Sequence, residues 1–139
     1  MRTHSQTFAL GFLQLILPVL LLMGIMTFAG PCGMHDDGSV SSCFWASRSL
    51  MGLAIALVLI ALGRLGLSQS RELRRGLNLA TVVLGILVLV TPGGLIDLCM
   101  MQTMRCHTIM RPFALVTGVL VSIVAIVDFF LVKPTRTDS

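Results

Sequence analysis

The sequence predicts an all-α integral membrane protein, a single domain over residues 1–139 built from four transmembrane helices. Hydrophobic residues make up 55% of the chain and charged residues only 12%, whereas soluble domains carry about 25% charged residues. The mean hydropathy is +0.95. The chain also holds four separate apolar runs, each close to the ~20 residues that a helix needs to cross a hydrocarbon core. Backbone in lipid must satisfy its own hydrogen bonds, so each run is predicted to be a helix.

The first run exceeds the ~7–15 apolar residues of a signal peptide and is followed by no clean A-x-A cleavage site, so it is predicted to be retained. The second run contains Arg64, whose long stem is expected to snorkel to the membrane interface. The third run should end or bend at Pro92. The predicted helices are Phe8–Ala29, Ser49–Leu67, Leu77–Ile96 and Pro112–Val132.

Lysine and arginine residues give the expected orientation. The termini and the 68–76 loop, with the helix ends beside them, carry more of them than the opposite side, and cytoplasmic segments are enriched in these residues. Both termini are therefore predicted to be cytoplasmic, with loops 30–48 and 97–111 outside. The basic residues lie near membrane ends, so the partner is the lipid bilayer rather than nucleic acid. The predicted cytoplasmic set is Arg2, Arg64, Arg71, Arg74, Arg75, Lys133 and Arg136, and the predicted outer set is Arg48, Arg105 and Arg111.

All four cysteines fall in the two predicted outer loops. Cys32 and Cys43 lie in the first, and Cys99 and Cys106 in the second. Cysteines in an oxidising compartment form structural disulfides. Pairing within each loop is the favoured arrangement, although four cysteines allow three connectivities.

A soft metal ion is the alternative use of the same loops. Thiolates and thioethers favour copper(I), and an added imidazole extends the choice to zinc or copper(II). The two cysteines of each loop stand farther apart than in usual structural zinc motifs, so ligands from both loops would have to converge. The candidate ligands are Cys32, Cys43, Cys99, Cys106, His107 and Met101.

The two halves of the chain repeat one pattern. Each outer loop has a cysteine, a methionine two residues later, a second cysteine and an arginine five residues after it. This predicts a tandem repeat of a two-helix hairpin whose halves are related by a pseudo-twofold axis along the membrane normal. Both cysteine loops would then lie near one axis.

Several residues have expected roles outside the cysteine pattern. Trp45, Arg48 and Arg111 are predicted to anchor the outer ends of their helices at the interface. Asp128 is expected to reach the interface or to pair with a cationic end. Gln14 and Asn78 lie towards the same side, and no chain of acids crosses the membrane, which argues against a proton-coupled transporter.

Small residues four apart predict close helix packing. One stripe lies on the second predicted helix and a longer one on the fourth. They are Gly52 and Ala56, and Ala114, Gly118 and Ser122.

The cysteine loops resemble those of a family of small bacterial and archaeal four-helix membrane proteins, domain of unknown function 4418. The segments are "PCGMHDDGSVSSCFWASRSLMGLA" and "LIDLCMMQTMRCHTIMRPFALVTG". The second carries the family's cysteine–histidine pair, Cys106–His107, whereas Phe44 stands where the first often has histidine. The resemblance implies no assigned activity. It implies an accessory subunit beside an ABC-type permease or ATPase.

Three functions are compatible with these features. The favoured one is an accessory or binding subunit whose outer loops are disulfide-bonded or bind a soft metal ion. The alternative is an enzyme, a quinone-linked thiol oxidase, in which two cysteine pairs pass electrons by thiol–disulfide exchange. Such enzymes usually present a C-x-x-C pair with a low-pKa thiolate, and neither pair has that spacing, so an enzyme is disfavoured. The third is a purely structural subunit of an ABC-type export complex.

Overall fold

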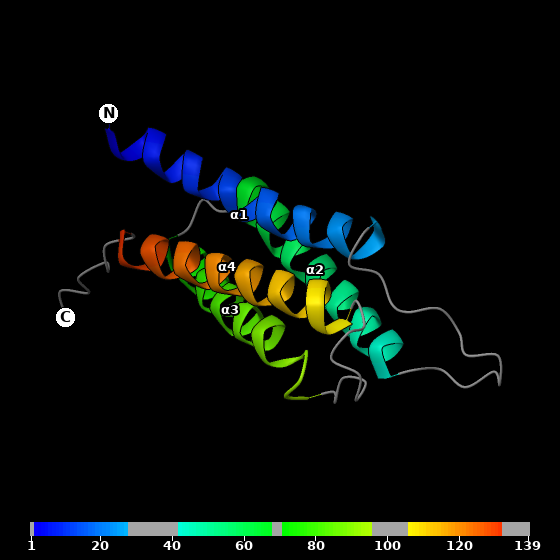
Figure 1. Ribbon diagram of the computed structural model, residues 1–139. Coiled ribbons are helices and arrows are strands. Elements are labelled where there is room, and N and C mark those ends of the chain that lie inside the picture. The colour runs from blue at the N-terminus through cyan, green and yellow to red at the C-terminus, as the bar shows by residue number, and fades with distance from the viewer. Residues whose placement is uncertain (1, 28–41, 68–70, 96–105, 132–139) are drawn as a thin grey trace.

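The computed structural model describes residues 2–27, 42–67, 71–95 and 106–131, and it contains four long helices that run alternately up and down (Figure 1). A short π-helical segment, η1, leads directly into the last helix. The start of α1, the end of α2, the start of α3 and the end of α4 lie at one end of the bundle. The elements are α1 (Arg2–Thr27), α2 (Ser42–Leu67), α3 (Arg71–Val90), η1 (Cys106–Met110) and α4 (Arg111–Leu131).

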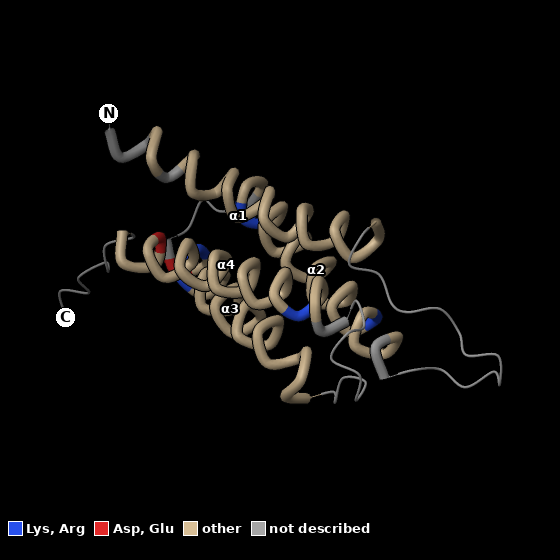
Figure 2. The backbone as a smooth tube through the Cα atoms, in the orientation of Figure 1, with Lys and Arg blue, Asp and Glu red and all other residues tan. Residues whose placement is uncertain are grey.

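Each of the four helices is long and apolar enough to cross a membrane. The lipid-facing positions of the bundle remain apolar, as at Leu59, Leu79 and Val116, whose exposed fractions are 62%, 59% and 59%. Figure 2 shows charged positions towards the two ends of the bundle and uncharged helix in between. For the residues that the structure describes, the prediction of an all-helical fold with four helices long and apolar enough to span a membrane is confirmed. The candidate spans are Phe8–Thr27, Phe44–Gly66, Glu72–Val90 and Thr108–Leu131.

The helices extend beyond the apolar runs on which the predicted bounds were based. α2 begins at Ser42, inside the expected loop 30–48, and α3 begins at Arg71, inside the expected loop 68–76. Hydropathy marks where lipid ends, whereas a helix continues through residues with good helix propensity such as leucine, arginine and glutamate. Arg71, Glu72 and Leu73 therefore lengthen α3 before its apolar run begins.

α3 ends at Val90, before the predicted end at Ile96, because Thr91-Pro92-Gly93 follows. Proline lacks the backbone N–H of a helical residue, and Gly93 adopts a φ of 93°, a conformation that suits glycine. The N–H groups of Gly94 and Leu95 donate to the carbonyl of Val90 at 3.0 Å, which closes the helix end.

The bundle is a closed ring in which each helix packs on two neighbours, α1 on α2 and α4, and α3 on α2 and α4. α3 and α4 approach most closely. A Cβ on Gly118 would lie 2.9 Å from the Leu89 side chain and 3.1 Å from the backbone oxygen of Gly85. Its stripe partners Ala114 and Ser122 are buried as well, so this stripe permits close packing as expected. Gly52 of the other stripe meets nothing within 4 Å and faces outward.

Candidate functional site

Five polar side chains, at least one from each long helix, meet inside the bundle near the end where α1 begins. Asp128 of α4 is at the centre. Arg64 of α2 donates to its Oδ2, and so does the Nδ2 of Asn78 of α3. Arg74 of α3 lies 3.2 Å from its Oδ1, and Arg64 also donates to Oε1 of Gln14 of α1. We call Gln14, Arg64, Arg74, Asn78 and Asp128 the polar centre.

The polar centre is shielded from its surroundings. Asp128 and Asn78 are 0% exposed, and Gln14 and Arg64 are each 3% exposed. Only the Arg74 side chain, at 24%, reaches outward. Removing charges from water is costly unless each finds a partner. Here two guanidinium groups share one carboxylate, so the centre is neutralised in part and keeps one excess positive charge.

The hydrogen bonding of the centre defines what it can do chemically. Both oxygens of Asp128 accept hydrogen bonds from guanidinium or amide donors, so this carboxylate is engaged as a structural acceptor. Three buried atoms of the polar centre have no hydrogen-bond partner among the described residues: the donors Nε2 of Gln14 and Nε of Arg74, and the acceptor Oδ1 of Asn78. Pro18, one helical turn after Gln14, is buried within α1. The geometry is that of a junction that fixes four helices relative to one another.

Sequence reasoning placed Arg64 wrongly. It was expected to snorkel, but its side chain is buried and paired with Asp128. The pairing of Asp128 with a cation is confirmed, although the partner lies inside the bundle and not at the interface. One signal could have revealed the centre: each predicted span holds a buried polar residue at a similar depth from the same end.

The predicted ligands lie largely outside the described residues. Cys32, Cys99 and Met101 fall there entirely. The backbones of Cys43 and Cys106 lie at the starts of α2 and η1, but their side chains and that of His107 are outside the described part. The side chains that are described include no group of three or more histidine, cysteine, aspartate or glutamate residues able to hold a metal ion.

The expected interface anchors are described, and they lie at the end opposite the polar centre. Trp45 is 61% exposed on the first turn of α2. The Arg48 guanidinium lies 5.1 Å from the ring centroid of Phe44. Arg111 is exposed at the start of α4, beside the turn at Gly93.

Four apolar helices around a buried ion pair define a small polytopic membrane protein of the four-helix-bundle class. Within that class, the chain belongs to the family described as a domain of unknown function, DUF4418, which matches residues 14–131. The matched region runs from Gln14 past Asp128, so it contains the whole polar centre and all four cysteines. No curated protein and no solved structure matches the chain.

Proposed function

We propose that this protein is an accessory or binding subunit of a bacterial or archaeal cytoplasmic membrane, and that the end of the bundle carrying the cysteines is its working surface. One observation carries the proposal. The up-and-down topology brings the starts of α2 and η1, which hold Cys43 and Cys106, to the same end of the bundle (Figure 1). At the other end, the charges of Arg64 and Asp128 are paired internally. The cysteine end is therefore the one with reactive groups available for binding.

Two chemistries fit this end, and both use the same sulfur atoms. Two disulfides, one in each hairpin, would crosslink the segments that connect the paired helices. A copper or zinc ion would instead draw thiolates from both connections, with an imidazole and a thioether completing the set. The proposed ligands or disulfide residues are Cys32, Cys43, Cys99 and Cys106, joined for a metal by His107 and Met101.

The proposal includes a tandem repeat of the α1–α2 and α3–α4 hairpins. A constant spacing of 64 residues, which separates Arg64 from Asp128, also separates many pairs of buried residues. Gln14 and Asn78 form a second polar pair at this spacing, so the polar centre itself has repeat-related halves. The further buried pairs at this spacing are Leu17 and Thr81, Leu21 and Gly85, Gly24 and Val88, Ala46 and Met110, Leu50 and Ala114, Ala54 and Gly118, Leu57 and Val121, and Ala61 and Ala125.

The π-helical turn accounts for a change of register in the proposed repeat. Cys43 and Cys106 stand 63 residues apart, one fewer than the buried pairs that follow them. Between Cys106 and Met110 the chain forms η1. A π-helix holds more residues per turn than an α-helix, because its hydrogen bonds run from i to i+5. One extra residue in this turn restores the match at Ala46 and Met110, and it leaves Arg48 and Arg111, which stand 63 residues apart, offset by one position.

Thiol and metal content of one preparation tests the chemistry. The full-length protein, purified in detergent, is denatured and its free thiols are counted, while a parallel sample is assayed by elemental mass spectrometry. Four free thiols with a stoichiometric copper or zinc ion support the metal site. No free thiols and no metal support two disulfides. Four free thiols without metal would remove the basis for a binding surface at this end.

Impermeant thiol labelling tests the orientation. Cells expressing variants that retain only Cys43 or only Cys106 are reduced and labelled while intact. Ser5→Cys in a cysteine-free chain is the matched control, because Ser5 is an exposed residue of α1 near the opposite end. Both native positions should be labelled and the control spared. Labelling of one native position without the other would refute the common surface.

An ABC-type permease or ATPase is the partner class implied by the family resemblance, and this part of the proposal is tested separately. A tagged chain expressed at its native level should retain such a subunit through detergent extraction. Recovery of the chain alone after chemical crosslinking would argue for an independent protein.

A further inference from the structure

Arg74 and Arg75 are adjacent in sequence, but their side chains lie in different surroundings. Arg74 turns inward to Asp128. The guanidinium of Arg75 instead lies 5.0 Å from the ring centroid of Phe129. Its Nε is buried without a hydrogen-bond partner, and neither ion pair among the described residues includes Arg75. Arg75 is thus a partly exposed cation near the polar centre with which no carboxylate of the described residues pairs.

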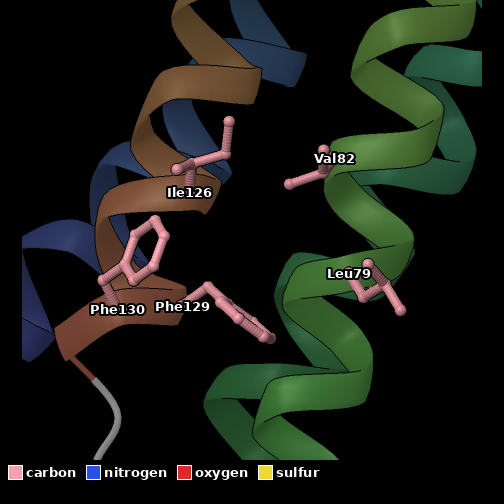
Figure 3. Close-up of a pocket in the computed structure, with 5 residues that line it drawn as sticks. All are labelled: Leu79, Val82, Ile126, Phe129 and Phe130. Carbon is pink, nitrogen blue, oxygen red and sulfur yellow. The ribbon is translucent and has the colours of Figure 1, made fainter.

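An apolar groove begins beside this cation. It lies between α3 and α4, has a volume of about 180 Å³, and is lined entirely by hydrocarbon side chains. Figure 3 shows α3 residues on one side and α4 residues on the other. The groove is open to the lipid, since Leu79 is 59% exposed and Phe130 is 76% exposed. Its lining residues are Leu79, Val82, Ile126, Phe129 and Phe130.

The cation and the groove form one continuous feature. Arg75 precedes Leu79 by four residues, so the two lie on the same face of α3, one turn apart. Phe129 belongs to both, because its ring contacts Arg75 and lines the groove. From Arg75 to Val82 the helix rises roughly 10 Å towards the membrane centre. A ligand that fits must carry a negative group at the membrane surface and a hydrocarbon chain below it.

We propose that this feature binds one anionic glycerophospholipid from the adjacent leaflet. The headgroup phosphate accepts hydrogen bonds from Arg75, because guanidinium groups recognise phosphate through charge-assisted bonds. One acyl chain lies along Leu79 and Val82, opposite Ile126. The excess positive charge of the polar centre, one helix face away, favours a lipid with net negative charge over a zwitterionic one.

Photolabelling in vesicles tests the proposal. The full-length protein is reconstituted in phosphatidylcholine vesicles that contain a trace of phosphatidylglycerol with a photoactivatable acyl chain, and labelled peptides are mapped by mass spectrometry. Labels should concentrate on the α3 and α4 peptides that line the groove. A phosphatidylcholine probe with the same acyl chain should label these peptides several-fold less.

Two variants and one matched control identify the determinants. Arg75→Gln should lower phosphatidylglycerol labelling of the groove roughly tenfold, the effect of losing a hydrogen bond to a charged group. Arg48→Gln is the control, since Arg48 stacks on Phe44 at 5.1 Å in the same way at the other end and should leave groove labelling unchanged. Val82→Phe should block the acyl chain and lower labelling by both probes.

The following results would overturn the proposal. Equal labelling by the two probes in the unmodified protein would reduce the groove to ordinary lipid contact. Unchanged labelling in Arg75→Gln, in a variant protein with an unaltered melting temperature, would show that Arg75 does not bind the headgroup. Unchanged labelling in Val82→Phe would show that no acyl chain lies along Val82 in the groove. Protection of the groove by a co-purified protein would assign it to a partner helix instead.

Discussion

The two ends of the bundle treat their polar residues in opposite ways. At the polar centre, Asp128 takes partners from α2 and α3 and is fully buried. At the cysteine end, Trp45, Arg48 and Arg111 are exposed, and the ring contacts of Trp45 and Arg48 are with Phe44 of the same helix. A charge in a low-dielectric interior is strongly stabilised only by its partners, so the polar centre fixes where the helices stand relative to one another. The exposed residues Trp45, Arg48 and Arg111 of the cysteine end carry no such constraint.

Of the substitutions that test this difference between the two ends, removal of the Asp128 carboxylate should change stability most. Asp128→Leu leaves Arg64 buried without its carboxylate partner, and removal of one member of a buried ion pair costs about 3–5 kcal/mol. Thermal unfolding in detergent, followed by circular dichroism, should show a large drop in melting temperature.

The double variant Arg64→Leu/Asp128→Leu distinguishes the stability contributed by the ion pair from the cost of leaving one charge unpaired. Replacing both charges with apolar side chains removes the stranded cation, so it should recover most of the lost stability. A double variant as unstable as Asp128→Leu would show that the ion pair is not what holds this end together.

The link to α1 should have a smaller effect. Gln14→Leu removes the acceptor that the Arg64 guanidinium uses on α1, and a hydrogen bond to a charged group is worth about 1.5–3 kcal/mol. The same unfolding assay measures it. A stability equal to that of the unmodified protein would exclude α1 from the polar centre.

Packing between the ends should matter to a similar or lesser degree. Gly118→Val places methyl groups against Leu89 and the backbone of Gly85, and overpacking of this kind costs about 1–3 kcal/mol. Gly52→Val is the matched control, because a Cβ added at Gly52 would meet nothing within 4 Å. Equal destabilisation by both variants would argue against the close α3–α4 contact.

The smallest effect is expected at the cysteine end. Arg48→Gln alters an exposed residue that lies over the Phe44 ring, and surface substitutions usually change stability by no more than about 0.5 kcal/mol. Its melting temperature should match that of the unmodified protein. A loss comparable to that of Asp128→Leu would abolish the distinction between the two ends.

Hydropathy was sufficient to predict the four helices because lipid imposes length and apolarity on any spanning segment. It could not predict which apolar face meets a neighbouring helix, because lipid tails are as apolar as leucine. Gly118 and Gly52 illustrate this limit. Both were expected in packing stripes, yet Gly118 meets α3 and Gly52 faces outward.

The pairing of Arg64 with Asp128 lay beyond local sequence rules for a different reason. Arg64 and Asp128 are 64 residues apart and belong to different hairpins, so nothing local pairs them. Arg64 lies near a helix end, where local rules favour snorkelling. The burial of both residues depends on the ring of helices, which appears only in three dimensions.

Pro18 interrupts the backbone hydrogen bonding of α1 at one point. A proline has no N–H to offer the carbonyl four residues before it, and that residue is Gln14, the α1 member of the polar centre. The backbone ladder of α1 is therefore interrupted where its side chain is tied to Arg64. A bend of α1 at this point would displace the half beyond Pro18 and leave the hydrogen bond between Arg64 and Gln14 in place.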